Sequence, residues 1–323
     1  MSQLFPNIKP FRQETLEVSG GHTLYIEQSG TPGGIPVAYL HGGPGGCIGE
    51  NYRRFFDPEK YWIIGFDQRG CGKSTPFGLL ENNHSQALVA DVLTIQDYLK
   101  IDKWLLFGGS WGSTLALLVA IEQPARVIGL ILRGIFLARE QDYAWYLAKN
   151  GGAAQLFPEY YQAFLAPIQK LLADFSIVDA YYHIFTNGNE VQKMAAIKAW
   201  YLWEARISWL HCQVDEDKLL PDDIHKAISL ALLECHFIKH KCFIAENAIL
   251  QKLDKIKHLP ATIIHGRYDT VCKIEAAYSL AENWQNSQLH IIPEAGHSAG
   301  EKAVTQALCS ATQDMAKYLK EQE

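Results

Sequence analysis

Short apolar runs alternate with helical patterns over the first 134 residues of the chain. Val37 to Leu40 and Trp104 to Phe107 are continuous apolar runs, which are typical of strands buried on both faces of a parallel sheet. The segments between such runs have helical periodicity and would supply the crossovers. The pattern predicts strands at 22–28, 36–40, 61–66, 103–107 and 128–132, and helices at 84–100 and 110–123.

The alternation stops from about 136 to 250, where the chain is rich in aromatic residues and poor in glycine. Long amphipathic stretches at 190–210 and 223–240 predict helices there. Further on the alternation resumes, with strands at 261–264 and 289–292 and helices at 274–283 and 301–321. We therefore predict an α/β fold, a mostly parallel sheet flanked by helices. Its core domain would comprise 1–135 and 255–323, with an inserted helical cap domain at 136–254.

Composition excludes several classes of protein. The 323 residues are 48% hydrophobic and 20% charged, as in a large globular protein. The formal net charge of −6 provides no basic surface for nucleic acid. No run of about 18 apolar residues predicts a membrane span, and the first residues lack the pattern of a signal peptide.

The seven cysteines are odd in number and irregularly spaced, which favours free thiols in a reducing compartment. We expect a cytoplasmic protein. The oligomeric state stays open at this point, a homo-oligomer being one option.

A candidate nucleophile, Ser110, lies in the segment Gly108-Gly109-Ser110-Trp111-Gly112, between a predicted strand and a predicted helix. This matches G-x-S-x-G, in which the glycines permit a sharp turn that lifts the serine hydroxyl above the sheet. A glycine-rich turn with a capping serine is the structural alternative.

A base and an acid for this serine follow two later strands. Asp269 comes after the strand at 261–264 and His297 after the strand at 289–292. The order serine, acid, histidine, each in a loop at the carboxyl end of a strand, is that of α/β hydrolases. Asp269 alone could form a turn and His297 alone could lie at the surface, but their joint order and placement favour a catalytic triad.

An oxyanion hole would complete the machinery. The glycine-rich loop from His41 to Gly46 leaves the strand at 36–40, as HGGG-type loops do. We assign the backbone N–H groups of Gly43 and Trp111 to this hole and expect His41 to brace the loop.

Two other sequence patterns are weaker evidence for a binding site. Gly70 to Thr75 ends like a phosphate-binding loop, but Asp67 stands where that motif needs its first glycine. The cluster Cys235, His236, His240 and Cys242 could hold zinc, yet no C-x-x-C pair accompanies it. We expect neither a metal ion nor a cofactor.

These motifs together resemble those of bacterial proline iminopeptidases, which are α/β hydrolases with a helical cap. The resemblance covers nearly the whole chain and is thinner from 140 to 250. It implies release of an N-terminal proline from small peptides by a Ser/His/Asp mechanism without metal. The segments that carry it are 21–25, 41–46, 67–74, 109–115, 132–136, 266–269 and 295–298.

The substrate's amine needs a partner of opposite charge. Glu204 and Glu234 each interrupt an apolar helical stripe, and the resemblance places both at amine-binding positions. The structural alternatives are an ion pair with Arg133 or Arg206, or a helix rotated so that the acid is solvated. The resemblance also implies a proline-ring pocket. The predicted substrate-binding residues are Glu204, Glu234, Phe136, Tyr146, Cys272 and Arg133.

This chain departs from the family pattern at Ala205, Lys273 and the segment 82–85, which leaves the strictness for proline over alanine open. Two rival functions also stay open: an esterase or lactonase of the same fold, and a hydrolase-fold binding protein without activity. Prolyl-naphthylamide compared with p-nitrophenyl acetate separates the first rival, and labelling of Ser110 by a fluorophosphonate separates the second.

Overall fold

A computed structural model describes residues 4–211, 219–221 and 223–322. In this part of the chain eight strands form one sheet in the order β1-β2-β4-β3-β5-β6-β7-β8. The pairs β1–β2 and β2–β4 are antiparallel and the other five are parallel. The strands are β1 (Arg12–Val18), β2 (His22–Gly30), β3 (Ile35–Leu40), β4 (Tyr61–Phe66), β5 (Trp104–Gly109), β6 (Val127–Arg133), β7 (Ala261–Gly266) and β8 (Ser287–Ile292).

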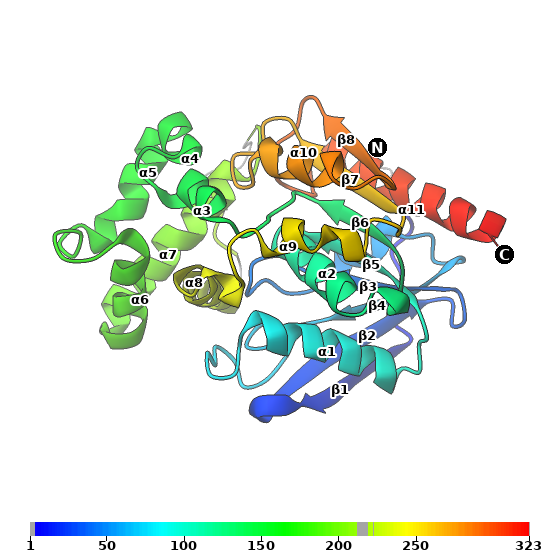
Figure 1. The fold of residues 1–323 in the computed structure, drawn as a ribbon. Helices are drawn as coiled ribbons and strands as arrows, with labels where there is room; N and C mark the ends of the chain where they lie inside the picture. The colour runs from blue at the N-terminus through cyan, green and yellow to red at the C-terminus, as the bar shows by residue number, and fades with distance from the viewer. Residues whose placement is uncertain (1–3, 212–218, 222, 323) are drawn as a thin grey trace.

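Helices cover both faces of the sheet (Figure 1). On one face lie α1 (Ser85–Tyr98), α2 (Trp111–Glu122), α9 (Ala248–Gln251) and α10 (Ile274–Glu282). The other face is covered by α11 (Lys302–Gln322) and the short helix η2 (Glu50–Phe55). The mostly parallel α/β sheet flanked by helices that the sequence predicts is therefore confirmed.

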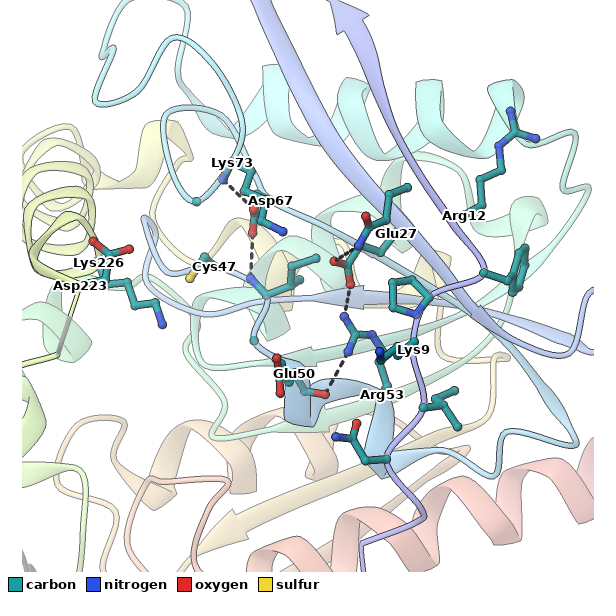
Figure 2. Close-up of a pocket in the computed structure, with 18 of the residues that line it drawn as sticks. Lys9, Arg12, Glu27, Cys47, Glu50, Arg53, Asp67, Lys73, Asp223 and Lys226 are labelled. Atoms are coloured by element: carbon teal, nitrogen blue, oxygen red, sulfur yellow. Dashed lines mark hydrogen bonds and ion pairs between the residues drawn. The ribbon is translucent and has the colours of Figure 1, made fainter.

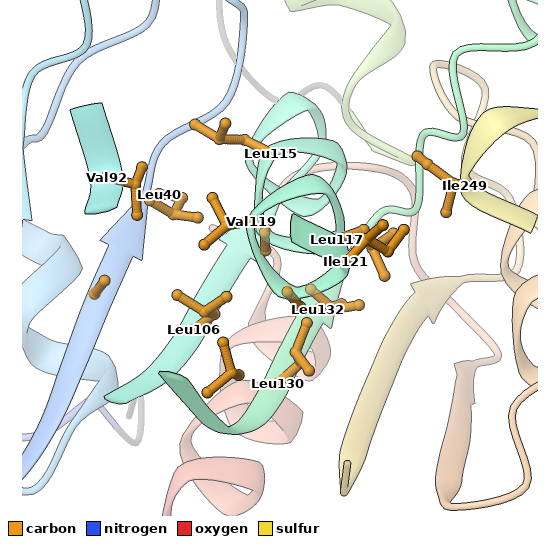
Figure 3. Packing of buried hydrophobic residues seen from close by; sticks show 14 of the residues in the cluster. Leu40, Val92, Leu106, Leu115, Leu117, Val119, Ile121, Leu130, Leu132 and Ile249 are labelled. Carbon is orange, nitrogen blue, oxygen red and sulfur yellow. The ribbon is translucent and has the colours of Figure 1, made fainter. Parts of the chain in front are cut away.

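Helix α2 lies at the centre of the main core and is buried on almost every side. This explains why its sequence is apolar nearly all round rather than along one stripe. Figure 3 shows its side chains against strands β3, β5 and β6 and against α1 and α9. The packed residues include Leu40, Val92, Leu106, Leu115, Leu117, Val119, Ile121, Leu130, Leu132 and Ile249. The residue that precedes α2, Ser110, is thereby held on a rigid element.

Most of the segment between β6 and β7, from 140 to 239, forms a separate group of helices beside the sheet (Figure 1). These are α3 (Glu140–Leu147), α4 (Gly152–Leu156), α5 (Pro158–Leu165), α6 (Ile177–Asn187), α7 (Glu190–Ile207) and α8 (Ile224–Lys239). They have their own aromatic cluster, in which Phe164 stacks on Tyr181 and Trp203 and meets Trp200 edge-on. Such ring pairs contribute beyond their buried area.

Five further single turns of 3₁₀-helix complete the described elements: η1 (Ser19–Gly21), η3 (Pro124–Arg126), η4 (Ala166–Ile168), η6 (Lys241–Phe243) and η7 (Leu253–Lys255). Within the described residues, no helix has both the length and the hydropathy needed to cross a bilayer. Six cysteines are free thiols, and Cys212 lies outside the described residues.

Strand β1 is the element that the sequence pattern missed. Its residues alternate, but apart from Leu16 and Val18 they are polar, and no buried run stands out. The strand forms because its backbone pairs with β2 from Arg12↔Gln28 to Val18↔His22. A partly solvated edge strand of this kind is recognised from its partner rather than from its own hydrophobicity.

Candidate active site

Ser110 lies at a sharp turn between β5 and α2, as predicted. Its backbone has φ 57° and ψ −127°, a conformation that an L-residue adopts only under strain. The two motif glycines make the turn sterically feasible. A Cβ at Gly108 would lie 2.1 Å from the carbonyl oxygen of Gly112, and one at Gly112 would lie 2.0 Å from that of Leu40. The strain exposes the serine hydroxyl at the carboxyl edge of the sheet.

Asp269 and His297 lie together in the loops after β7 and β8. Nδ1 of His297 donates to Oδ2 of Asp269 at 2.7 Å, while Oδ1 accepts from the backbone N–H groups of Val271 and Cys272 at 3.0 and 2.8 Å. Burial alone would raise the pKa of Asp269, but His297 and these hydrogen bonds outweigh it and lower the pKa. The carboxylate therefore stays ionised and orients the imidazole.

The other ring nitrogen of His297 faces Arg133 rather than the serine. Nη1 of Arg133 lies 3.1 Å from Nε2 and also donates to the backbone oxygen of His297 at 3.1 Å. Ser110 and His297 both lie in the described part of the chain, and no hydrogen bond joins their side chains. A serine–histidine contact is often longer in the substrate-free state of a hydrolase.

The glycine loop after β3 passes directly beside Ser110. A Cβ on Gly42 would lie 3.4 Å from Cβ and 3.9 Å from Oγ of the serine. Gly43 has φ +114°, which requires glycine. Trp111 is the first residue of α2, so its amide has no acceptor inside the helix. Both amides thus belong to segments that border the nucleophile.

A buried network braces this loop, and it includes residues that the sequence patterns did not single out. Nε2 of His41 accepts from the backbone N–H of Gln68 at 3.0 Å, and the Gln68 side chain donates to the His41 carbonyl at 2.9 Å. The Gln68 amide oxygen accepts from the Trp111 indole at 2.9 Å. Burial lowers the pKa of His41, which favours a neutral bracing ring, as expected.

His265, in β7, also lies near the site, and no sequence motif assigns it a role. Its Nε2 lies 2.8 Å from the carbonyl of Cys272, and its Nδ1 accepts from the backbone N–H of Ile135 at 3.1 Å. Burial lowers its pKa, although Asp269 opposes the shift. A neutral His265 therefore ties the Asp269 loop to the end of β6. Its position inside the sheet, in β7, gave no sequence signal for this.

A small cavity brings most of the predicted substrate-binding residues to Ser110. Its lining includes Gly43 and Ser110 from the core, and Phe136, Tyr146, Glu204, Glu234 and Cys272. Arg133 is absent from the lining and contacts His297 instead. Residues from six separate parts of the chain thus converge on one small cavity that is mostly apolar with a few polar groups, as ligand sites are.

The two glutamates of this cavity come from neighbouring helices, Glu204 from α7 and Glu234 from α8. Oε2 of Glu234 accepts from the Trp200 indole at 2.7 Å, and Oε2 of Glu204 accepts from the Tyr146 hydroxyl at 3.2 Å. Glu234 is 5% exposed. Burial and the neighbouring Glu204 carboxylate raise the pKa of Glu234 well above its ordinary value. This environment favours the protonated form of Glu234, and a cation bound beside it would favour the ionised form.

Tyr146 and Cys272 form an apolar wall of the cavity. Burial, reinforced by Glu204, raises the pKa of Tyr146. Burial, reinforced by Asp269, also raises the pKa of the Cys272 thiol well above its ordinary value. Both groups are therefore neutral at physiological pH, which suits contact with an aliphatic ring.

A larger cavity, of about 750 Å³, lies between the N-terminal segment, the residues after the glycine loop and the start of α8 (Figure 2). Two of its acids are engaged within the protein. Glu27 pairs with Arg53, and Asp67 accepts from the backbone N–H groups of Ile48 and Lys73 at 2.8 Å each. The lining of this larger cavity shares no residue with that of the Ser110 cavity. The larger of the two cavities is therefore not the one that contains the candidate nucleophile.

The two weaker sequence patterns have structural roles. The turn at 70–73 wraps the Asp67 carboxylate, and the next α-helix begins only at Ser85, so the helix start of a phosphate-binding loop is missing. The thiol of Cys235 donates to the Val178 carbonyl, and Nε2 of His236 faces the Asn83 carbonyl. Among the described residues no group of three or more potential ligands converges.

Comparisons with known proteins define the class. The family model of the alpha/beta hydrolase fold matches residues 35–303, so the chain is an α/β hydrolase. A probable proline iminopeptidase of Leptolyngbya boryana is 43% identical over 313 residues, covering 97% of this chain and 96% of the relative. The proline iminopeptidase of Xanthomonas citri is 43% identical over 321 residues, covering 98% and 100%. The chain belongs to the proline iminopeptidase family.

Solved structures support the same fold. The proline iminopeptidase of Mycobacterium smegmatis superposes with a TM-score of 0.62 at 19% identity, covering 97% of this chain and 100% of that one. An esterase from Exiguobacterium antarcticum reaches 0.61 at 21% identity, covering 94% and 98%. At such identities the likeness concerns the fold alone.

Proposed function

We propose that this chain is a serine exopeptidase that releases an N-terminal proline from small peptides. One observation carries the proposal: a single small cavity is lined by Ser110 and by both Glu204 and Glu234. An amino-terminal residue carries its amine one atom away from its carbonyl carbon. A nucleophile and an anionic pair facing one small space therefore suit a substrate of that geometry.

In the proposed reaction His297 takes the proton of Ser110, whose Oγ attacks the prolyl carbonyl carbon. Asp269 holds the imidazole and stabilises the imidazolium. The N–H groups of Gly43 and Trp111 bind the oxyanion. His297 then protonates the leaving amine, and the C–N bond breaks. Water, activated by the same histidine, hydrolyses the prolyl-enzyme and frees proline and serine.

Specificity would come from the cavity. A secondary ammonium has two N–H donors, and Glu204 and Glu234 supply acceptors in a desolvated space where charge pairing is strong. Phe136, Tyr146 and Cys272 would enclose the ring. Because the amine would pair with the two glutamates, a substrate with a blocked amine would lose this pairing and is expected to be inert.

We further propose the division of the chain into a core, 1–135 and 255–323, and a helical cap, 136–254, that carries the glutamates. The free thiols favour a cytoplasmic location. The partners are small peptides with an N-terminal proline, and the site as described needs no second subunit.

The test is a panel of proline, alanine, glycine and leucine naphthylamides, an N-blocked prolyl naphthylamide and p-nitrophenyl acetate. We expect kcat/KM to be highest for proline and the blocked substrate to be inert. Comparable turnover of the blocked and free substrates would indicate the esterase or lactonase alternative. Failure of a fluorophosphonate to label Ser110 would indicate a binding protein without activity.

A further inference from the structure

Arg133 places a cation beside the turn that carries the nucleophile. It is the last residue of β6, in register with Gly109 of β5, and its backbone oxygen accepts from the N–H of Ser110 at 2.8 Å. Its guanidinium lies over Gly109, where a Cβ would be 2.5 Å from Nη2. The missing side chain at Gly109 gives the guanidinium room beside the nucleophile.

The guanidinium bonds His297 twice, on Nε2 and on the backbone oxygen, each at 3.1 Å. Nε2 must carry its lone pair to accept from Arg133, because a guanidinium has donors only. That lone pair is the one that the base needs for the Ser110 proton. The contact therefore blocks the catalytic step for as long as it lasts.

Arg133 also lacks a counter-ion. Among the described residues no carboxylate pairs with it, and its side-chain hydrogen bonds go to His297 alone. The acids of the site are engaged elsewhere: Asp269 with the other ring nitrogen of His297, Glu234 with Trp200 and Glu204 with Tyr146. A poorly neutralised cation beside the scissile position is a strong attractor for an oxygen acceptor of an incoming ligand.

We propose that Arg133 is a substrate-operated latch on the catalytic base: it holds Nε2 of His297 in the resting enzyme and leaves it for an oxygen of the bound peptide. This inference rests on the proposed function for its ligand, a short peptide. The oxygen that draws Arg133 away belongs to the residue after proline, as its carbonyl or terminal carboxylate. Ser110 then replaces Arg133 on Nε2.

The test uses two reactions with different needs. In labelling by a fluorophosphonate, Oγ of Ser110 bonds to phosphorus, fluoride leaves and the serine proton passes to His297, without any amine recognition. Cleavage of the dipeptide Pro-Gly needs the latch, the base and the amine site. The variants are Arg133→Met, which removes the charge and all donors, and Arg133→Lys, which keeps a cation. Arg126→Gln is the matched control, since Arg126 pairs with Asp97 outside the site.

We expect opposite changes. Loss of a charge-assisted hydrogen bond to Nε2 should raise the labelling rate constant of Arg133→Met by about tenfold, while kcat/KM for Pro-Gly falls by a similar factor. Arg133→Lys should fall between this variant and the wild type in both measurements, and Arg126→Gln should match the wild type.

Three results overturn the latch. A slower labelling rate constant in Arg133→Met would make Arg133 a brace that the base requires. Unchanged labelling with weaker cleavage would make it a plain substrate-binding residue. An unchanged rate constant with a smaller labelled fraction would also overturn it, because the molecules that do fold would then label no faster than the wild type. Labelling does not depend on prolyl specificity, so a failure of the proposed function is seen separately, as absent cleavage by the wild type.

Discussion

Replacement of Glu234 by glutamine tests the amine site most directly. Glutamine has nearly the same size, and its amide oxygen can still accept from the Trp200 indole, which donates at 2.7 Å to the native carboxylate. The cavity and its packing should therefore survive. What is lost is one negative charge facing the substrate ammonium.

The magnitude follows from the burial of that charge. A hydrogen bond to a charged group contributes about 1.5–3 kcal/mol, which corresponds to roughly a 10- to 150-fold loss of kcat/KM for prolyl-naphthylamide. Hydrolysis of p-nitrophenyl acetate, which has no amine, should stay within about twofold of the wild type. Glu282→Gln, at an exposed position on α10, is the matched control and should change neither reaction.

The pH dependence sharpens this test. Because burial and Glu204 raise the pKa of Glu234, the wild-type side chain becomes neutral as the pH falls, and glutamine then imitates it. The ratio of wild-type to variant kcat/KM should thus grow with rising pH towards a plateau. Equal losses on both substrates, or a ratio that grows as the pH falls, would refute the reasoning.

Three further outcomes are expected. Ser110→Ala should abolish both prolyl turnover and fluorophosphonate labelling while leaving the melting temperature within a few degrees of the wild type. Gly112→Ala should lower the free energy of unfolding by about 3 kcal/mol or more, because its Cβ would lie 2.0 Å from the Leu40 carbonyl; Gly49→Ala, with open space around it, is the control in denaturant titrations. The raised pKa of Glu234 means that the folded state binds the extra proton, so wild-type stability falls as pH rises from the ordinary glutamate pKa through the raised one. Glu234→Gln should remove this decline, and an identical melting profile against pH for both proteins would contradict it.

Much of the candidate site at the carboxyl edge of the sheet was predictable, because each of its residues lies in a recognisable local sequence pattern. Ser110 needs a sharp turn, and the glycines that permit it are its neighbours in the chain. Asp269 and His297 follow apolar runs that predict adjacent parallel strands, and the ends of such strands meet at one edge of the sheet. Order along the chain was therefore enough to predict that they meet, and the 2.7 Å contact agrees.

Other features depend on contacts that no local pattern encodes. Strand β1 is polar and forms through its pairing with β2. The sequence suggested Arg133 either as an ion-pair partner of a glutamate or as a substrate ligand, whereas the structure places it on His297, 164 positions away. Both predictions relied only on the positive charge of Arg133. The register of β5 and β6, which sets Arg133 opposite Gly109, determines which neighbours its guanidinium reaches.

Periodicity and glycine spacing are properties of neighbouring residues, so the class of fold, the order of the candidate triad and the two acids on apolar helix faces were predictable without a structure. Tertiary structure alone decided that Glu234 would bond the Trp200 indole, that both glutamates would share a cavity with Ser110, and that Arg133 would rest on the base. Burial and the packing of distant segments set the charge state of these groups, and neither is encoded within a single segment.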